Sequence, residues 1–303
     1  MKHLFIINPA AGKHDQTVRL STAIRALCEA RGMDFAIRVS KQAGDCTAIT
    51  RAAAASGAEY RVYACGGDGT LNEVVCGAAG AANLAVTHFP CGSGNDFVKN
   101  FSDPRAFTEL ERLLDPVETT LDLIQVGNDY SLSICSIGID ARIGTSIQRY
   151  KHLPLIGGRG AYNLSTVVNL IQGVHRHYTV ELDGQSVDGR FTLICVCNGR
   201  YYGGGYEPVP EARPNDGKLE VLLVKRFPGS RWRRSSASTS SAAMPKCRKF
   251  SRTIRPTGSA SAATARRSSI WTARPATART WRFASRTTSC ASSTPAAWSC
   301  AEK

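Results

Sequence analysis

The sequence lacks an apolar run long enough to cross a membrane. A spanning helix needs about 18 to 20 consecutive apolar residues, and no segment of the 303-residue chain reaches that length. The first apolar run, Leu4–Ile7, is also too short for the core of a signal peptide. We therefore expect a cytoplasmic protein that meets a membrane only at its surface, as a peripheral protein.

Zinc-type spacing is also missing among the eleven cysteines. No two of them form a CxxC pair, and no cluster of histidines lies near one. Structural zinc sites depend on such spacing. Without a secretion signal, we expect reduced thiols rather than a disulfide framework.

The last quarter of the chain has almost no acidic residues. Residues 226–303 hold 16 of the 38 Lys and Arg residues but only one of the 24 Asp and Glu residues, Glu302. The formal net charge of +14 therefore arises entirely in this tail. Such a tail can attract polyanions without specificity, and no nucleic-acid-binding motif accompanies it, so we expect no specific nucleic-acid partner.

The tail is equally poor in core-forming residues. Residues 227–303 contain no Leu, Val, Asp, Asn, Gln, His or Tyr, yet they hold all four tryptophans. Neither a helical nor a strand period continues for more than a few residues. We expect an irregular, disordered or frameshifted tail over 227–303, and the frameshift hypothesis explains the tryptophans best. In the frame shifted by two bases, GC-rich codons for 270–274 would encode Leu-Asp-Gly-Glu.

Residues 1–122 alternate β-rich runs with helical patterns. Strands are predicted at 4–8, 34–40, 60–65 and 83–90, and helices at 19–32, 45–57 and 70–80. This alternation predicts βαβ units and a parallel sheet, whose ligands bind beyond the carboxyl ends of the strands. The prediction is an α/β nucleotide-binding domain.

Residues 123–226 have a different sequence pattern. Apolar, β-branched runs separated by Gly, Asn and Asp occur at 121–127, 130–138, 177–184, 189–199 and 217–226. They predict a mostly antiparallel β-sandwich domain. One helical pattern, 158–173, interrupts the runs.

A glycine-rich turn follows the third predicted strand and opens a helix. It reads Gly66-Gly67-Asp68-Gly69-Thr70. Glycines allow backbone N–H groups to approach phosphate oxygens closely, and the helix directs its positive N-terminal end to the same place. The Asp68 carboxylate suits Mg²⁺. An alternative explanation is a plain turn in which Thr70 and Glu73 form a capping box.

Two further motifs flank this turn in order. Asn8-Pro9-Ala10-Ala11-Gly12-Lys13 precedes it, and Gly92-Ser93-Gly94-Asn95-Asp96-Phe97 follows it. Together with GGDGTLNE they resemble the diacylglycerol kinase catalytic family, and the resemblance extends over about residues 1–225. It implies a phosphofructokinase-like first domain, a lipid-binding β domain and transfer of the γ-phosphoryl group of ATP to a lipid hydroxyl at a membrane surface.

The resemblance also implies site residues. Those expected to bind ATP are Asn8, Gly12, Lys13, Ser40, Gly66, Gly67, Asp68, Gly69, Thr70, Leu71, Asn72, Glu73, Ser93 and Asn95. Asp68, Asp96 and Asp122 would hold the catalytic Mg²⁺. Arg213, Asp216 and Lys218 would hold a structural Mg²⁺, although a Pro-Asn-Asp-Gly turn alone also accounts for Asp216.

The catalytic base has no candidate in this sequence. In the family it belongs to a late Asp-Gly-Glu motif, and residues 227–303 contain no Asp. We therefore expect a poor or inactive lipid kinase. The alternatives are an NAD kinase-like enzyme, and a non-catalytic nucleotide-binding protein whose basic tail binds polyanions.

Overall fold

The chain divides into two compact units in a computed structural model. The structure describes residues 1–138, 176–182 and 185–225, and short strands at 263–265, 271–275 and 282–285. The first unit contains Met1–Ser133, Asn198–Lys218 and Pro275–Lys303, and the second contains Ile134–Cys197 and Leu219–Arg274. The division is therefore not linear, because the segment 198–218 returns to the first unit.

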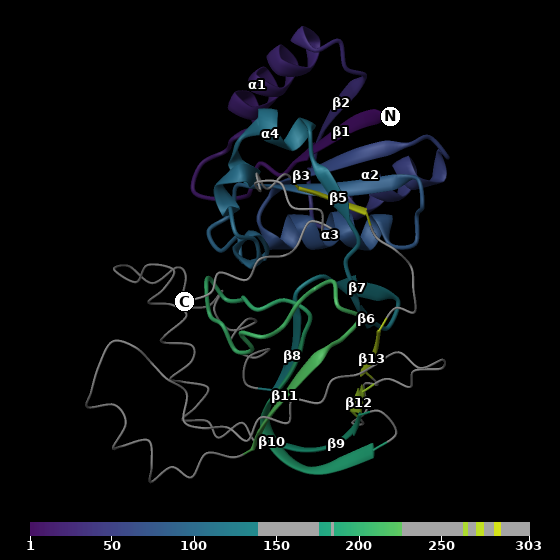
Figure 1. The fold of residues 1–303 in the computed structure, drawn as a ribbon, viewed down its shortest axis with the longest axis vertical. Coiled ribbons are helices and arrows are strands. Elements are labelled where there is room, and N and C mark those ends of the chain that lie inside the picture. The colour runs from purple at the N-terminus through teal and green to yellow at the C-terminus, as the bar shows by residue number, and fades with distance from the viewer. Residues whose placement is uncertain (139–175, 183–184, 226–262, 266–270, 276–281, 286–303) are drawn as a thin grey trace, which may run out of the picture. The chain divides into compact units, whose positions relative to one another are not determined.

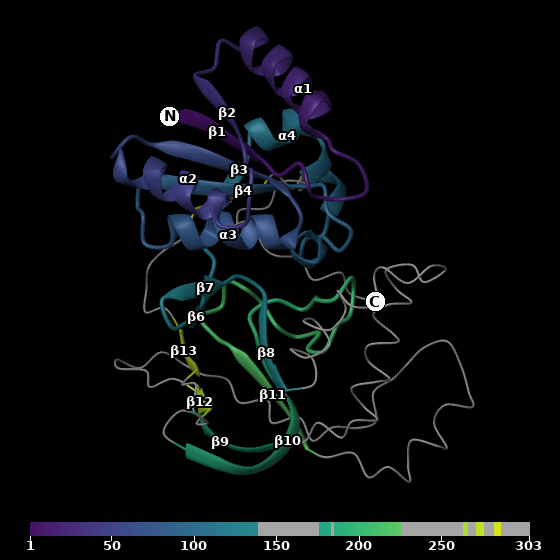
Figure 2. The same cartoon turned by 180° about the vertical axis from the view of Figure 1, so that it is seen from behind.

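Four parallel strands form the centre of the first unit (Figure 2). Their order is β2 (Phe35–Val39), β1 (Lys2–Ile7), β3 (Tyr60–Gly66) and β4 (Leu84–Pro90). Phe5 of β1 lies opposite Ile37 on one side and Tyr63 on the other. All four strands agree with the sequence prediction to within two residues, and the predicted fold class is confirmed.

Helices cover both faces of this sheet (Figures 1 and 2). α1 (Thr17–Ala30) lies on one side, and α2 (Asp45–Ala55) and α3 (Asp68–Ala78) lie on the other. In α1 the buried residues Leu20, Ile24 and Cys28 recur every four positions, so they form one apolar face. The three helices were predicted to within two residues at either end.

Short elements follow β4, and among them β5 (Val117–Thr119) extends the sheet through β14 (Arg282–Ser285). The others are η1 (Phe97–Asn100), η2 (Pro104–Thr108), α4 (Leu110–Leu114) and the hairpin of β6 (Ile124–Val126) with β7 (Asp129–Ser131), which belongs to the other sheet. Strand β14 runs parallel to β4 and antiparallel to β5. The tail, expected to be irregular, thus contributes a strand to this sheet.

The second unit is antiparallel, as predicted. The long strand β10 (Gln185–Cys197) pairs with β9 (Arg176–Leu182) along its first half, and with β8 (Ile134–Gly138) and β11 (Glu220–Lys225) along its second. Two tail strands, β12 (Ala263–Ala265) and β13 (Trp271–Pro275), continue from β9. The helix predicted at 158–173 lies outside the described residues.

Candidate nucleotide site

Three loops converge where β1, β3 and β4 end. The first follows β1 from Asn8, the second is the glycine-rich turn after β3, and the third follows β4 from Cys91. Because these strands are parallel neighbours, their carboxyl ends share one edge of the sheet. The first loop is held by backbone bonds, since the Asn8 N–H donates to the Cys65 carbonyl at 3.0 Å. A Cβ at Gly12, whose φ is +84°, would collide with the Cys91 carbonyl oxygen of the third loop. The motifs separated in sequence are therefore in contact.

The helix after the glycine-rich turn begins at Asp68, with Gly67 as its N-cap and no side-chain capping bond. The capping-box interpretation is therefore wrong. The Thr70 hydroxyl instead accepts a hydrogen bond from the Asn8 amide at 2.9 Å, which joins the first loop to the second. Gly66 is required beside it, because a Cβ there would collide with the Thr70 side chain.

The second and third loops approach each other through bare backbone. A Cβ placed on Gly92 would lie 2.6 Å from the Gly67 Cα, closer than real Cβ contacts allow. Only glycine permits this approach. The backbones of both loops therefore remain uncovered by side chains at this point, as a phosphate-binding loop requires.

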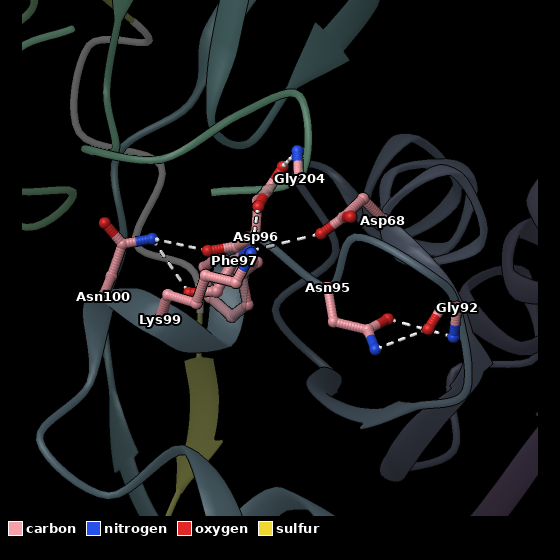
Figure 3. A network of polar contacts seen from close by, with 8 residues as sticks. All are labelled: Asp68, Gly92, Asn95, Asp96, Phe97, Lys99, Asn100 and Gly204. Atoms are coloured by element: carbon pink, nitrogen blue, oxygen red, sulfur yellow. Dashed lines mark hydrogen bonds and ion pairs between the residues drawn. The ribbon is translucent and has the colours of Figure 1, made fainter. Parts of the chain in front are cut away.

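Asn95 shapes the third loop. It has the positive φ of +50°, unusual for a residue other than glycine. Its side-chain oxygen accepts from the Gly92 N–H at 3.0 Å, and its side-chain amide donates to the Gly92 carbonyl at 2.8 Å (Figure 3). Its side chain is thus engaged within the loop that it closes.

Asp68 and Asp96 come together beside this loop. A Cβ on Gly94 would lie 3.0 Å from Asp68 Oδ2 and 3.7 Å from Asp96 Oδ2, so both carboxylates border Gly94. Asp68 Oδ1 accepts from the Phe97 N–H at 3.1 Å (Figure 3). Burial raises the pKa of Asp68 above its usual value, and the negative charge of Asp96 raises it further. The hydrogen bond from the Phe97 N–H lowers this pKa, but by less than burial raises it.

Asp96 links the third loop to the returning segment 198–218. It is only 6% exposed. Its Oδ1 accepts from Lys99 Nζ at 2.6 Å, and its Oδ2 accepts from the Gly204 N–H at 2.7 Å (Figure 3). Asn100, one turn onward, accepts from the Arg200 N–H at 2.9 Å. The Asp-Phe motif therefore anchors the triple-glycine segment as well as bordering the site.

The residues after the GGDGT turn have structural contacts. Leu71 is buried in the core. Asn72 accepts from the Leu132 N–H at 3.2 Å and donates to the Tyr130 carbonyl at 3.2 Å, while Glu73 accepts from the Gly44 N–H at 3.1 Å. These three side chains fasten α3 to its neighbours, so a contribution to nucleotide binding would come from the helix backbone.

The remaining predicted ATP residues differ in exposure. Ser40 is buried at the end of β2, and its N–H donates to the Ile7 carbonyl at 2.9 Å. Lys13 and Ser93 are exposed on the first and third loops, and Gly69 is exposed in the first turn of α3. All three residues are accessible to a ligand.

Asp122 lies with Asp216 rather than with the Asp68 pair. Its Oδ2 accepts from the Gly217 N–H at 2.7 Å, and its N–H donates to the Pro214 carbonyl at 2.7 Å. Burial raises the pKa of Asp122, and the Asp216 charge acts in the same direction. Of the three carboxylates expected around the catalytic Mg²⁺, the structure thus brings Asp68 and Asp96 together. The third, Asp122, is bonded to the Pro-Asn-Asp-Gly turn.

That turn contains the residues expected at the structural Mg²⁺. Asp216 accepts from the Lys218 N–H at 3.1 Å, the local bond typical of an Asp turn. Arg213 and Asp216 are exposed, and Lys218 is half-buried. Turn chemistry and the bond to Asp122 account for this geometry without a metal.

The donor set beside Gly94 fits Mg²⁺ carried by a nucleotide. Among the described residues no group of three or more His, Cys, Asp or Glu side chains is placed to hold a metal. Mg²⁺ in nucleotide sites is usually held by one or two carboxylates together with phosphate oxygens. Asp68 and Asp96 supply two such carboxylates, and the phosphates would supply the remainder.

Three residues that make important contacts belong to none of the sequence motifs and were not predicted. Lys99 pairs with Asp96, Asn198 donates to the carbonyls of Asp122 and Leu132, and His88 bonds to Gly66. Only Lys99 carries a signal in the sequence, because a spacing of three from Asp96 favours an ion pair on a helical turn. The other two depend on long-range pairing.

Comparisons with known proteins agree with this geometry. Residues 2–126 match the diacylglycerol kinase catalytic domain, and residues 133–239 match the YegS C-terminal NAD kinase beta sandwich-like domain. A protein of Chromohalobacter salexigens named "Probable lipid kinase YegS-like" is 33% identical over 223 residues, which cover 71% of this chain and 70% of the relative. The chain belongs to the diacylglycerol kinase family of lipid kinases.

A solved structure supports the fold of this lipid kinase. The crystal structure of a diacylglycerol kinase from Bacillus anthracis superposes with a TM-score of 0.60 at 20% identity, over 93% of this chain and 90% of that chain. No helix within the described part of the chain is both long and apolar enough to span a membrane.

Proposed function

We propose that this lipid kinase binds ATP with Mg²⁺ at the three convergent loops and transfers the γ-phosphoryl group to a lipid hydroxyl, such as that of diacylglycerol. The observation that carries the proposal is the approach of Gly92 to Gly67 directly beside the Asp68 and Asp96 carboxylates. Bare backbone N–H groups and hard anionic oxygens are the two features that an ATP–Mg²⁺ phosphate site needs.

The chain's own residues would divide the work between binding and positioning. The backbone around Gly67 and the N-terminus of α3 would bind phosphate oxygens. Asp68 and Asp96 would hold Mg²⁺, which when bound neutralises charge on the β- and γ-phosphates. Lys99 and the Gly204 N–H fix the Asp96 carboxylate, so that it needs little reorganisation when a nucleotide binds.

We further propose that turnover is weak. Phosphoryl transfer needs a base to orient the acceptor hydroxyl, and the late Asp-Gly-Glu motif that supplies it in the family is missing from residues 227–303. The residues proposed to position the phosphates and the metal are still present. Nucleotide binding would therefore survive, whereas activation of the acceptor hydroxyl would not. The enzyme would bind its lipid substrate at a membrane surface.

Incubation of the full chain with γ-labelled ATP, Mg²⁺ and diacylglycerol micelles tests this proposal. We expect slow labelling of diacylglycerol, well below that given by a lipid kinase that carries the late Asp-Gly-Glu motif, and no labelling of NAD in a parallel reaction. Asp68→Asn should abolish the slow labelling, and Asp34→Asn, an exposed carboxylate at the start of β2, should leave it unchanged.

Other outcomes of the assay have distinct meanings. Labelling of NAD instead of lipid would favour an NAD kinase-like activity. Labelling of diacylglycerol at the rate of a kinase that carries the late Asp-Gly-Glu motif would contradict the proposed defect. ATP binding without labelling of any acceptor, even over long incubation, would indicate a nucleotide-binding protein without transferase activity.

A further inference from the structure

A buried histidine lies directly beneath the glycine-rich turn. His88 occupies the interior of β4 and is 0% exposed. Its Nε2 lies 3.0 Å from the Gly66 carbonyl oxygen. A carbonyl can only accept a hydrogen bond, so Nε2 must carry the proton and donate. Nε2 is therefore the protonated nitrogen, and the bond gives the ring a defined orientation.

The Gly66 carbonyl receives two donors. The Cys91 N–H donates to the same oxygen at 2.7 Å, one residue beyond the end of β4. One donor comes from a side chain inside β4 and the other from the backbone that follows it. Together they fix the peptide that joins Gly66 to Gly67.

The orientation of this peptide decides where the Gly67 N–H points. In a planar trans peptide the carbonyl and the following N–H point in opposite directions. With the Gly66 carbonyl held towards β4, the Gly67 N–H is directed away from β4, at the position where Gly67 caps α3. That N–H belongs to the backbone proposed to bind phosphate.

Packing alone does not account for a histidine here. An apolar side chain would fill the interior of a buried strand without desolvating a polar ring. His88 Nδ1 is buried and has no hydrogen-bond partner among the described residues. The imidazole thus has an unsatisfied acceptor, Nδ1, in the core, which costs stability. The hydrogen bond from Nε2 to the Gly66 carbonyl offsets this cost.

We propose that His88 is a positioning residue of the phosphate loop, which acts through the Gly66 carbonyl to present the Gly67 N–H to the nucleotide. This role rests on the proposed ATP site. Burial lowers the pKa of His88 to about 4, so the ring stays neutral near pH 7 and contributes a hydrogen bond rather than a charge.

Three variants test the proposal in the full chain. His88→Leu removes the donor and fills the space, whereas His88→Gln keeps an N–H donor at a similar reach. His3→Leu is the matched control, because His3 is also buried with a single hydrogen bond, to the Tyr63 hydroxyl at 2.8 Å, but lies at the opposite end of the sheet. Circular dichroism would verify folding, and His88→Met would replace a Leu variant that fails to fold.

Two measurements separate this inference from the proposed function. Hydrogen exchange of the free protein, followed by mass spectrometry, reports how firmly the segment 66–72 is held whether or not ATP binds. We expect His88→Leu to accelerate exchange there, and His3→Leu and His88→Gln to leave it near wild type. Calorimetric titration with ATP and Mg²⁺ should give about 5- to 10-fold weaker binding for His88→Leu, the equivalent of one hydrogen bond.

Contrary results would overturn the inference. Unchanged exchange over 66–72 in His88→Leu would mean that the imidazole does not hold the loop. A Gln variant as defective as the Leu variant would mean that the donor is not what matters. A wild type that fails to bind ATP, with faster loop exchange in His88→Leu alone, would overturn the proposed function and still support His88 as the residue that holds the loop.

Discussion

Glycines at the site are distinguished by what surrounds them. Gly92 has the Gly67 Cα beside it, whereas Gly69 has nothing within 4 Å and lies in the first turn of α3. The two positions therefore differ in the effect of one added methyl group, although both belong to glycine-rich motifs. A motif in the sequence does not reveal this difference.

We predict that Gly92→Ala weakens ATP binding at least about 10-fold, because the loops must separate to admit the Cβ, with a loss of stability of about 1 to 3 kcal/mol. Gly69→Ala should leave stability equal or raise it by up to about 1 kcal/mol, since alanine favours a helix. Titration with ATP and thermal unfolding would check both. Equal ATP affinity in the two variants would contradict the close approach of the loops.

Buried histidines make stability depend on pH. Burial lowers the pKa of His88 to about 4, against about 6.5 in the unfolded chain. A lowered pKa stabilises the fold above the unfolded value, and this stability is lost as the pH falls from about 6.5 towards 4. His3, whose pKa is also lowered to about 4 by burial and by the Arg61 charge, acts in the same direction.

We therefore predict that His88→Leu flattens the decline in unfolding free energy between pH 6.5 and 4 by about 3 kcal/mol. Asp68 and Asp122, whose pKa values are raised by burial, favour the folded state as the pH falls. They are present in both proteins, so the difference isolates the imidazole. Urea unfolding at several pH values would measure it, and parallel curves would show that His88 titrates normally.

At the scale of elements, one side chain joins the returning segment to the first unit. Asn198 is fully buried. Its amide donates to the Asp122 carbonyl at 2.7 Å and to the Leu132 carbonyl at 2.8 Å, and its own N–H donates to the Ser133 carbonyl at 2.7 Å. It therefore connects the start of segment 198–218 to the residues that flank the hairpin β6–β7.

We predict that Asn198→Ala lowers the free energy of unfolding by about 2 to 4 kcal/mol, because two buried carbonyls lose their donor. Asn128→Ala, at an exposed position in the β6–β7 turn, should change it by less than about 0.5 kcal/mol. Chemical unfolding of the two variants would measure the difference. Equal stabilities would contradict a connecting role for Asn198.

The sequence predicts the elements of the first unit well because each has a clear period. The apolar runs of β1, β3 and β4 are buried along nearly their whole length, and α1 buries every fourth residue. Strand and helix bounds therefore follow from local pattern. The tail strand β14 has no such pattern, and its position next to β4 depends on long-range pairing.

The site is predictable only in part for the same reason. The three motifs that converge were predicted from their order and their positions after strands. The partners of the carboxylates were not, because Gly204 and Gly217 lie about 100 residues from Asp96 and Asp122 along the chain. The resemblance grouped Asp122 with Asp68 and Asp96, whereas the bonds of Asp122 in the structure join it to the turn that contains Asp216.

At the scale of the whole molecule, charge is divided unequally along the chain. Residues 226–303 hold 16 Lys and Arg against one acid. We predict that the full chain binds heparin with an affinity that falls steeply as salt rises. Replacing Arg231, Arg233 and Arg234 with Gln should reduce the slope of that dependence, and replacing exposed Arg19, Arg25 and Arg38 should not.

The frameshift hypothesis also belongs to this scale. It predicts that the DNA encoding the tail, read in the frame shifted by two bases, continues the alternating β pattern and encodes Leu-Asp-Gly-Glu across codons 270–274. Sequencing the gene from codon 226 to the end of the tail would decide between the two readings of the tail. A shifted frame with early stop codons and no β pattern would refute the hypothesis.

An ATP titration of the full chain in the presence and absence of Mg²⁺ tests whether the convergent loops and the Asp68–Asp96 pair form an ATP–Mg²⁺ site. Wild type and Asp34→Asn should bind ATP more tightly with Mg²⁺ than without it, and Asp68→Asn should lose at least about 10-fold of that Mg²⁺-dependent gain. An Asp68→Asn variant that binds ATP–Mg²⁺ as tightly as wild type would contradict the account.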